Sequence, residues 1–167
     1  MNIGMLLIST WFGCSGVDKS EDILKAQKEM AANNLSTAGQ QFGAILQEVP
    51  GEAVASTSMA HIHMLNGDFT QADAVLASIQ TEDPQVKSQV ALRRALVALE
   101  AKDFSKVKEF AQQSTESFAY ILVAEISLMD GEHDEAAAAL EQVKGAHASL
   151  AQSYLSLLEG DEWSKAY

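Results

Sequence analysis

A short turn motif recurs along the chain and limits the fold more strongly than any other feature of the sequence. Gly67-Asp68-Phe69 is followed three residues later by Ala72, a small residue. Related motifs begin at Asn33, Lys102, Gly131 and Gly160, so that the successive spacings are 34, 35, 29 and 29 residues. A period of this length is the signature of a repeat protein, in which each unit buries its apolar face against its neighbours.

The residues of the motif suit a junction between two helices. Glycine, and less often asparagine, ends a helix because it readily adopts the left-handed backbone conformation. An Asp or Asn that follows it can accept hydrogen bonds from the free N–H groups of the next helix. Pro50 and Pro84, which are also 34 residues apart, are expected to end one unit and begin the next.

Between the motifs the apolar residues recur with the period of a helix. Ala72, Val75, Leu76 and Ile79 stand at positions i, i+3, i+4 and i+7, and no stretch shows sustained strand alternation. We therefore predict an all-α fold. The expected helices cover 20–33, 36–48, 53–66, 70–80, 87–101, 104–114, 117–130, 134–144 and 147–159, with a further helix beginning at Trp163.

This helix–turn–helix pattern resembles the tetratricopeptide repeat family over residues 20–167, about four and a half units. The unit 53–86 matches the family pattern best, with small residues at Ala60 and Ala72 and a closing proline at Pro84. Elsewhere Asn33 and Lys102 replace the turn glycine, and the last two spacings are shorter than the family period. The resemblance implies a right-handed α-solenoid of antiparallel helix pairs.

In this family the first helix of each pair lines a concave groove that holds a peptide or a partner helix. Counting from the turn motifs places nine side chains on the groove side of these helices. They are Thr57, His61 and Met64 in the second unit, Gln89, Arg93 and Leu96 in the third, and Phe118, Ile121 and Glu125 in the fourth. The alternative, strongest for Leu96 and Ile121, is packing between adjacent first helices.

The charge of the chain is strongly acidic and unevenly distributed. Its 11 basic and 23 acidic residues give a net charge of −12, which argues against nucleic acids and anionic membrane surfaces as partners. Residues 51–86 carry five acidic and no basic side chains, whereas 87–117 carry six basic and four acidic ones. Arg93 is best placed to bind a carboxylate or an acidic segment. Solvated helix faces would give the same pattern.

Catalytic and metal-binding motifs are missing from the sequence. It contains no phosphate-binding loop, nucleophile elbow or dinucleotide-binding glycine motif. His61 and His63 lie two residues apart, and on a helix such side chains point in nearly opposite directions, so they do not readily share one ion. We therefore expect no cofactor, no metal and no enzymatic activity.

The N-terminus has the features of a bacterial lipoprotein signal. Residues 1–13 are uncharged and contain the apolar run 3–8, which is too short to span a bilayer, and Gly13 precedes Cys14, the single cysteine. The resemblance implies that residues 1–13 are a signal peptide, that Cys14 is acylated, and that 14–19 form a tether. Trp11 and the uncharged start depart from the usual signal. An apolar terminus packed on the first helix is the alternative.

The C-terminal helix over 147–159 carries an apolar face that ends the repeat array. Its members are Leu150, Tyr154, Leu155, Leu157 and Leu158. We predict that Trp163 and Tyr167 fold back over part of this face; otherwise the exposed patch is expected to drive self-association or partner docking.

Together these features predict a non-catalytic interaction scaffold or assembly adaptor, anchored in the bacterial cell envelope through Cys14 and facing the periplasm. The alternative is a cytoplasmic interaction module that self-associates through its C-terminal face. A small catalytic domain would need a cluster of titratable groups, which the sequence does not offer.

Overall fold

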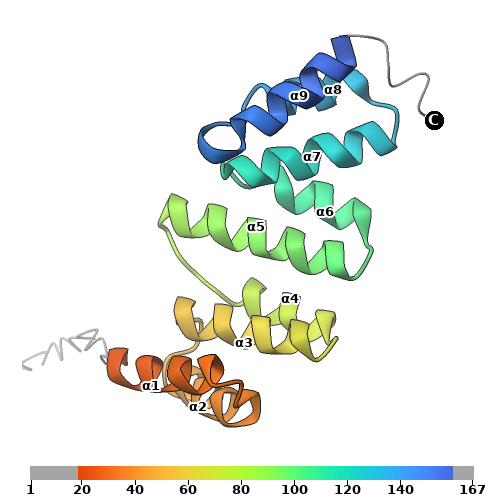
Figure 1. The fold of residues 1–167 in the computed structure, drawn as a ribbon. Helices are drawn as coiled ribbons and strands as arrows, with labels where there is room; N and C mark the ends of the chain where they lie inside the picture. Colours follow the sequence, from red (N-terminus) through yellow and green to blue (C-terminus); the bar gives the residue numbers. More distant parts are fainter. Residues whose placement is uncertain (1–18, 160–167) are drawn as a thin grey trace, which may run out of the picture.

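The computed structural model describes residues 19–159, and all regular structure in that range is helical. Four antiparallel helix pairs follow one another and stack into an elongated array, with α1 and α2 at one end and α9 at the other (Figure 1). The pairs are α1 (Ser20–Ala31) with α2 (Leu35–Glu48), α3 (Ala53–Leu65) with α4 (Phe69–Ala77), α5 (Pro84–Glu100) with α6 (Phe104–Ala111), and α7 (Ser117–Met129) with α8 (His133–Leu140). A short 3-10 turn, η1 (Gly145–His147), leads into α9 (Ala148–Glu159). The predicted all-α solenoid is confirmed.

Several helix boundaries differ from the sequence expectation, by up to four residues at the end of α8, and both helices at the junction of the second and third units are affected. Helix α4 ends at Ala77 and not at residue 80, and α5 begins at Pro84 and not at residue 87. Proline suits the first turn of a helix because its missing N–H would have no intrahelical partner there. The Asp83 carboxylate caps this start by accepting a hydrogen bond from the Gln85 N–H at 2.8 Å. Pro84 therefore begins α5 and does not end α4.

The four turns inside the helix pairs share one backbone geometry. Each contains a residue with positive φ, namely Asn33 (62°), Gly67 (76°), Lys102 (59°) and Gly131 (77°). At the second turn the Gly67 N–H donates to the Met64 carbonyl and the Asp68 N–H donates to the His63 carbonyl, both at 2.9 Å. The same pair of bonds closes the other three turns, which makes each of them a Schellman motif. Lys102 stands where the second and fourth turns have glycine, and it adopts the same turn geometry.

Small buried residues let the helices of each pair approach closely. Ala26 and Ala38 have no exposed surface in the first unit, and Ala72 and Ala136 have none in α4 and α8. Around them the apolar side chains gather in three clusters. The largest cluster extends from α5 to α9, a second joins α1, α2 and α3, and a small third one consists of Ala60, Ala72, Leu76 and Val97.

Neighbouring units are also joined by ion pairs, one between α4 and α5 and another between α6 and the start of α8. The Arg94 guanidinium donates to both Asp73 carboxylate oxygens, at 2.6 and 3.2 Å, and lies 4.0 Å from the centre of the Phe110 ring. Lys108 pairs with Glu132 and, at 2.6 Å, with Glu135. Hydrogen bonds to Glu132 and Glu135 raise the pKa of Lys108, and the bond from Lys108 is the main reason why the pKa of Glu135 is lowered.

The predictions for the two ends of the chain lie outside the described residues. These are the signal peptide over 1–13, acylation at Cys14, most of the tether over 14–19, the helix expected to begin at Trp163, and the folding back of Trp163 and Tyr167. Within 19–159, no helix is long and apolar enough to span a membrane.

Candidate functional site: a groove across three first helices

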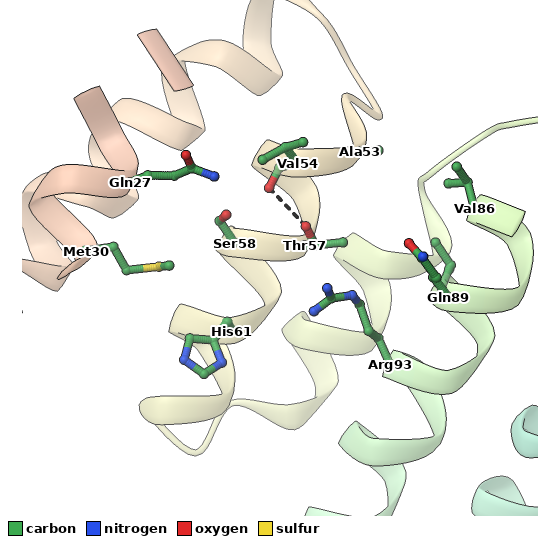
Figure 2. Close-up of a pocket in the computed structure, with 11 residues that line it drawn as sticks. Gln27, Met30, Ala53, Val54, Thr57, Ser58, His61, Val86, Gln89 and Arg93 are labelled. Carbon is green, nitrogen blue, oxygen red and sulfur yellow. Dashed lines mark hydrogen bonds between the residues drawn. The ribbon is translucent and has the colours of Figure 1, made fainter. Parts of the chain in front are cut away.

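A groove of about 480 Å³ crosses the first helices of three successive units. Figure 2 shows side chains from α1, α3 and α5 around the same space. Ligand pockets in proteins commonly have volumes of about 300–1,000 Å³, so the groove is large enough to hold a short peptide segment or a few side chains of a partner. It is lined by Gln27, Met30, Ala53, Val54, Thr57, Ser58, His61, Val86, Gln89, Val90 and Arg93.

Helical spacing explains why these residues share one surface. On α3 the lining residues Val54, Thr57, Ser58 and His61 stand at i, i+3, i+4 and i+7, which is one face of a helix. On α5 the lining residues Val86, Gln89, Val90 and Arg93 repeat the same spacing. Helix α1 adds Gln27 and Met30, which are three residues apart. The groove is therefore formed by matching faces of equivalent helices.

The groove combines apolar side chains with polar groups that have few internal partners. Met30, Val54, Val86 and Val90 supply the apolar part. The Thr57 hydroxyl donates to the Val54 carbonyl of its own helix at 3.0 Å. The exposed Arg93 side chain extends from α5 towards α3 (Figure 2), and no ion pair within residues 19–159 includes it. Such a surface offers apolar contact together with a cationic hydrogen-bond donor.

Four of the nine predicted groove residues line this space: Thr57, His61, Gln89 and Arg93. Two others pack against core clusters, Met64 against the small cluster and Leu96 against the largest one.

The three candidates on α7 lie away from the groove. Ile121 is 2% exposed and belongs to the largest core cluster, so it is corrected from a partner contact to a packing residue. Phe118 stacks at a tilt on His147, with 5.7 Å between ring centres. The Glu125 carboxylate accepts a hydrogen bond from the Tyr154 hydroxyl at 3.3 Å. Phe118 and Glu125 both remain exposed, so of these three candidates only Ile121 is withdrawn from the surface.

Several lining residues are absent from the set predicted from the sequence. Gln27 and Met30 belong to the first unit, which the count from the turn motifs does not include. Val86 is absent because the third unit's helix is expected to start one residue later. Val54 and Ser58 carry a usable signal, since they stand three residues before Thr57 and His61 on the same helical face.

A smaller cavity of about 150 Å³ lies on another side of the solenoid, between α4, α5 and α6. The paired Asp73 and Arg94 side chains form part of its wall. No group of three histidine, aspartate or glutamate side chains that could hold a metal ion is found within residues 19–159.

The fold and the groove together define an α-solenoid of paired helices with an open ligand-sized surface. The tetratricopeptide repeat family model matches residues 29–99, which contain all of the lining residues except Gln27. Among solved structures, the crystal structure of MamA is similar, with a TM-score of 0.61 over 84% of this chain and 96% of that chain. The two sequences are 16% identical, so the likeness concerns the fold. No curated protein matches the chain. Neither the repeat family model nor the MamA structure indicates an enzyme family.

Proposed function

We propose that this protein is a non-catalytic interaction scaffold or assembly adaptor that binds a peptide or a partner helix in the groove formed by α1, α3 and α5. The observation that carries the proposal is the alignment of three equivalent helix faces around one open space of about 480 Å³. The tetratricopeptide repeat match over 29–99 supports it, because repeats of this type form protein–protein interaction modules.

Site-specific photo-crosslinking tests the groove. A photoreactive amino acid at Gln89, which is exposed in the groove, is expected to capture a defined protein in cells, whereas the same group at Gln47, exposed on α2, is not. The captured band should disappear when Val54→Trp fills the groove from α3. Equal capture at both positions, or capture that is indifferent to Val54→Trp, would show that the partner uses another surface.

We further propose that Cys14 anchors the scaffold in the bacterial cell envelope. The support is the uncharged apolar segment before the cysteine, with Gly13 directly preceding it. Intact mass and fractionation in a bacterial host test this. Loss of residues 1–13 with a lipid-sized gain in mass, both abolished by Cys14→Ser, is the expected result. An unmodified full-length chain in the soluble fraction would refute the anchor.

Self-association through α9 is a second candidate function, associated with the cytoplasmic alternative. The side chains of Leu150 and Leu157, in the last helix that the structure describes, are 45% and 42% exposed. If a second copy covers this face, the sedimentation coefficient should rise with protein concentration, and Leu157→Asp should suppress the rise. A coefficient independent of concentration would count against this role.

A further inference from the structure

The lining of the groove has a composition that the overall charge of the protein does not predict. The chain carries a net charge of −12 and has 23 Asp and Glu residues, yet none of the 11 residues that line the groove is acidic. The lining instead contains Arg93 and His61. The formal charge of the lining is thus opposite in sign to the net charge of the whole molecule.

Residues 51–86 supply much of the surface beside the groove, and all five of their acidic residues have intramolecular partners. Three of them cap helix starts. The Glu52 carboxylate accepts the Ala55 N–H at 2.6 Å, Asp68 accepts the Gln71 N–H at 3.2 Å, and Asp83 accepts the Gln85 N–H at 2.8 Å. These carboxylates are held at helix ends, where the exposed N–H groups favour negative charge.

The other two carboxylates form ion pairs with α5. Asp73 is bound by both donors of Arg94, and Glu82 pairs with Lys87 at 3.0 Å. The adjacent arginines of α5 therefore have different surroundings. Arg94 is neutralised between the second and third units, whereas Arg93 projects into a space without a lining carboxylate.

From this arrangement we infer that the groove selects acidic peptide segments in which Asp or Glu stands beside an aliphatic residue. The ligand carboxylate accepts hydrogen bonds from the Arg93 guanidinium, a geometry in which two parallel bonds can form. The aliphatic neighbour contacts the apolar part of the lining formed by Met30, Val54 and Val90. This inference rests on the proposed function and specifies the chemistry of the partner.

The lining favours a protein segment over a nucleic acid. Nucleic-acid binding relies on several Lys and Arg side chains that neutralise successive phosphates. The groove has one arginine, and the protein around it is acidic. A peptide with one carboxylate beside an aliphatic side chain matches the single arginine and the valine side chains of the groove lining.

Selection from a phage-displayed library of random dodecapeptides tests the inference and does not require an identified partner. The full-length chain is the target, in parallel with Arg93→Gln and with Lys102→Gln, which removes one positive charge at an exposed turn outside the groove lining. The native protein and Lys102→Gln are expected to enrich sequences with Asp or Glu beside Val, Leu or Ile. Arg93→Gln is expected to lose the acidic enrichment.

Fluorescence polarisation with the strongest selected peptide then measures the contact. Replacing its acidic residue with the matching amide should weaken binding to the native protein about tenfold or more, as expected for a charge-assisted hydrogen bond. Arg93→Gln should bind the acidic peptide about as weakly as the native protein binds the amide form, and should discriminate little between the two.

Two kinds of result would overturn the inference, and they differ in what they say about the proposed function. Selection of neutral or basic sequences whose binding is blocked by Val54→Trp would refute the acidic preference and leave groove binding intact. Acidic peptides that bind in the groove independently of Arg93 would refute the Arg93 contact on which the inference depends, again leaving groove binding intact. Peptides that bind Val54→Trp as tightly as the native protein would refute the groove as the binding site, and the inference with it.

Discussion

Replacing Lys102 by glycine should stabilise the protein, because this residue occupies a backbone conformation that glycine adopts more easily. Its φ of 59° places it in the left-handed region, at the same position of the turn as Gly67 and Gly131. This region costs an ordinary L-residue about 1–2 kcal/mol. The greater freedom of glycine in the unfolded chain offsets about 0.4–1 kcal/mol of that gain. The Lys102 side chain is exposed, and we expect a net stabilisation of about 0.5–1 kcal/mol.

Urea unfolding monitored by circular dichroism measures the effect. With a urea dependence of about 2 kcal/mol per molar, the midpoint of Lys102→Gly should rise by about 0.3–0.5 M. Lys102→Ala is the matched control, since it removes the same charge and side chain but keeps the cost of positive φ. Gly67→Ala should lower the midpoint, because an added Cβ would meet open space and backbone conformation is then the main cost. Equal stabilisation by Lys102→Gly and Lys102→Ala would refute the backbone explanation and assign the gain to charge removal.

Three further substitutions test the packing and the ion pairs between units. Phe42→Ala should lower the free energy of unfolding by about 3–5 kcal/mol, as measured by urea unfolding, because the ring is completely buried. Asp73→Asn should cost about 1 kcal/mol, and a double-mutant cycle with Arg94→Gln should show coupling; additive effects would mean that the pair contributes nothing. The native protein should be more stable than Glu135→Gln above about pH 4.3, which is the usual pKa of a glutamate in an unfolded chain. This difference in stability should vanish as the pH falls through the lowered pKa of Glu135 in the folded protein. Unfolding at pH 7, 5 and 3 checks this, and an advantage as large at pH 3 as at pH 7 would contradict the role of the Lys108 bond.

The turn motifs account for most of what the sequence can predict about the fold. Their spacing locates each helix pair, and the structure places Asn33 and Lys102 in the left-handed conformation expected for glycine. The caps are only partly predictable. Asp68 and Asp103 accept N–H bonds from the following helix, whereas the Asn34 side chain donates to Glu29 instead. The start of α5 is harder to predict, because a proline between two helices can follow the first or begin the second.

The groove is partly predictable, because helical spacing defines a face but not what covers that face. Thr57 and Arg93 lie on faces that remain open, so counting along the helix finds them. The same count on α7 selects Phe118 and Ile121, whose surroundings depend on η1, α9 and the core. The charge pattern singles out Arg93, but its separation from neighbouring carboxylates depends on caps and ion pairs that only the tertiary structure reveals.

The division of the core into three clusters has a consequence for how the protein unfolds. The small cluster of Ala60, Ala72, Leu76 and Val97 lies between two larger ones, and the chain crosses this junction through the non-helical segment 78–83. In a repeat array the coupling between neighbours sets the size of the cooperative unit. The solenoid should therefore contain two folding blocks, α1–α4 and α5–α9, which meet at this junction. Because the groove spans the same junction, a bound segment would couple the blocks and make them unfold as one.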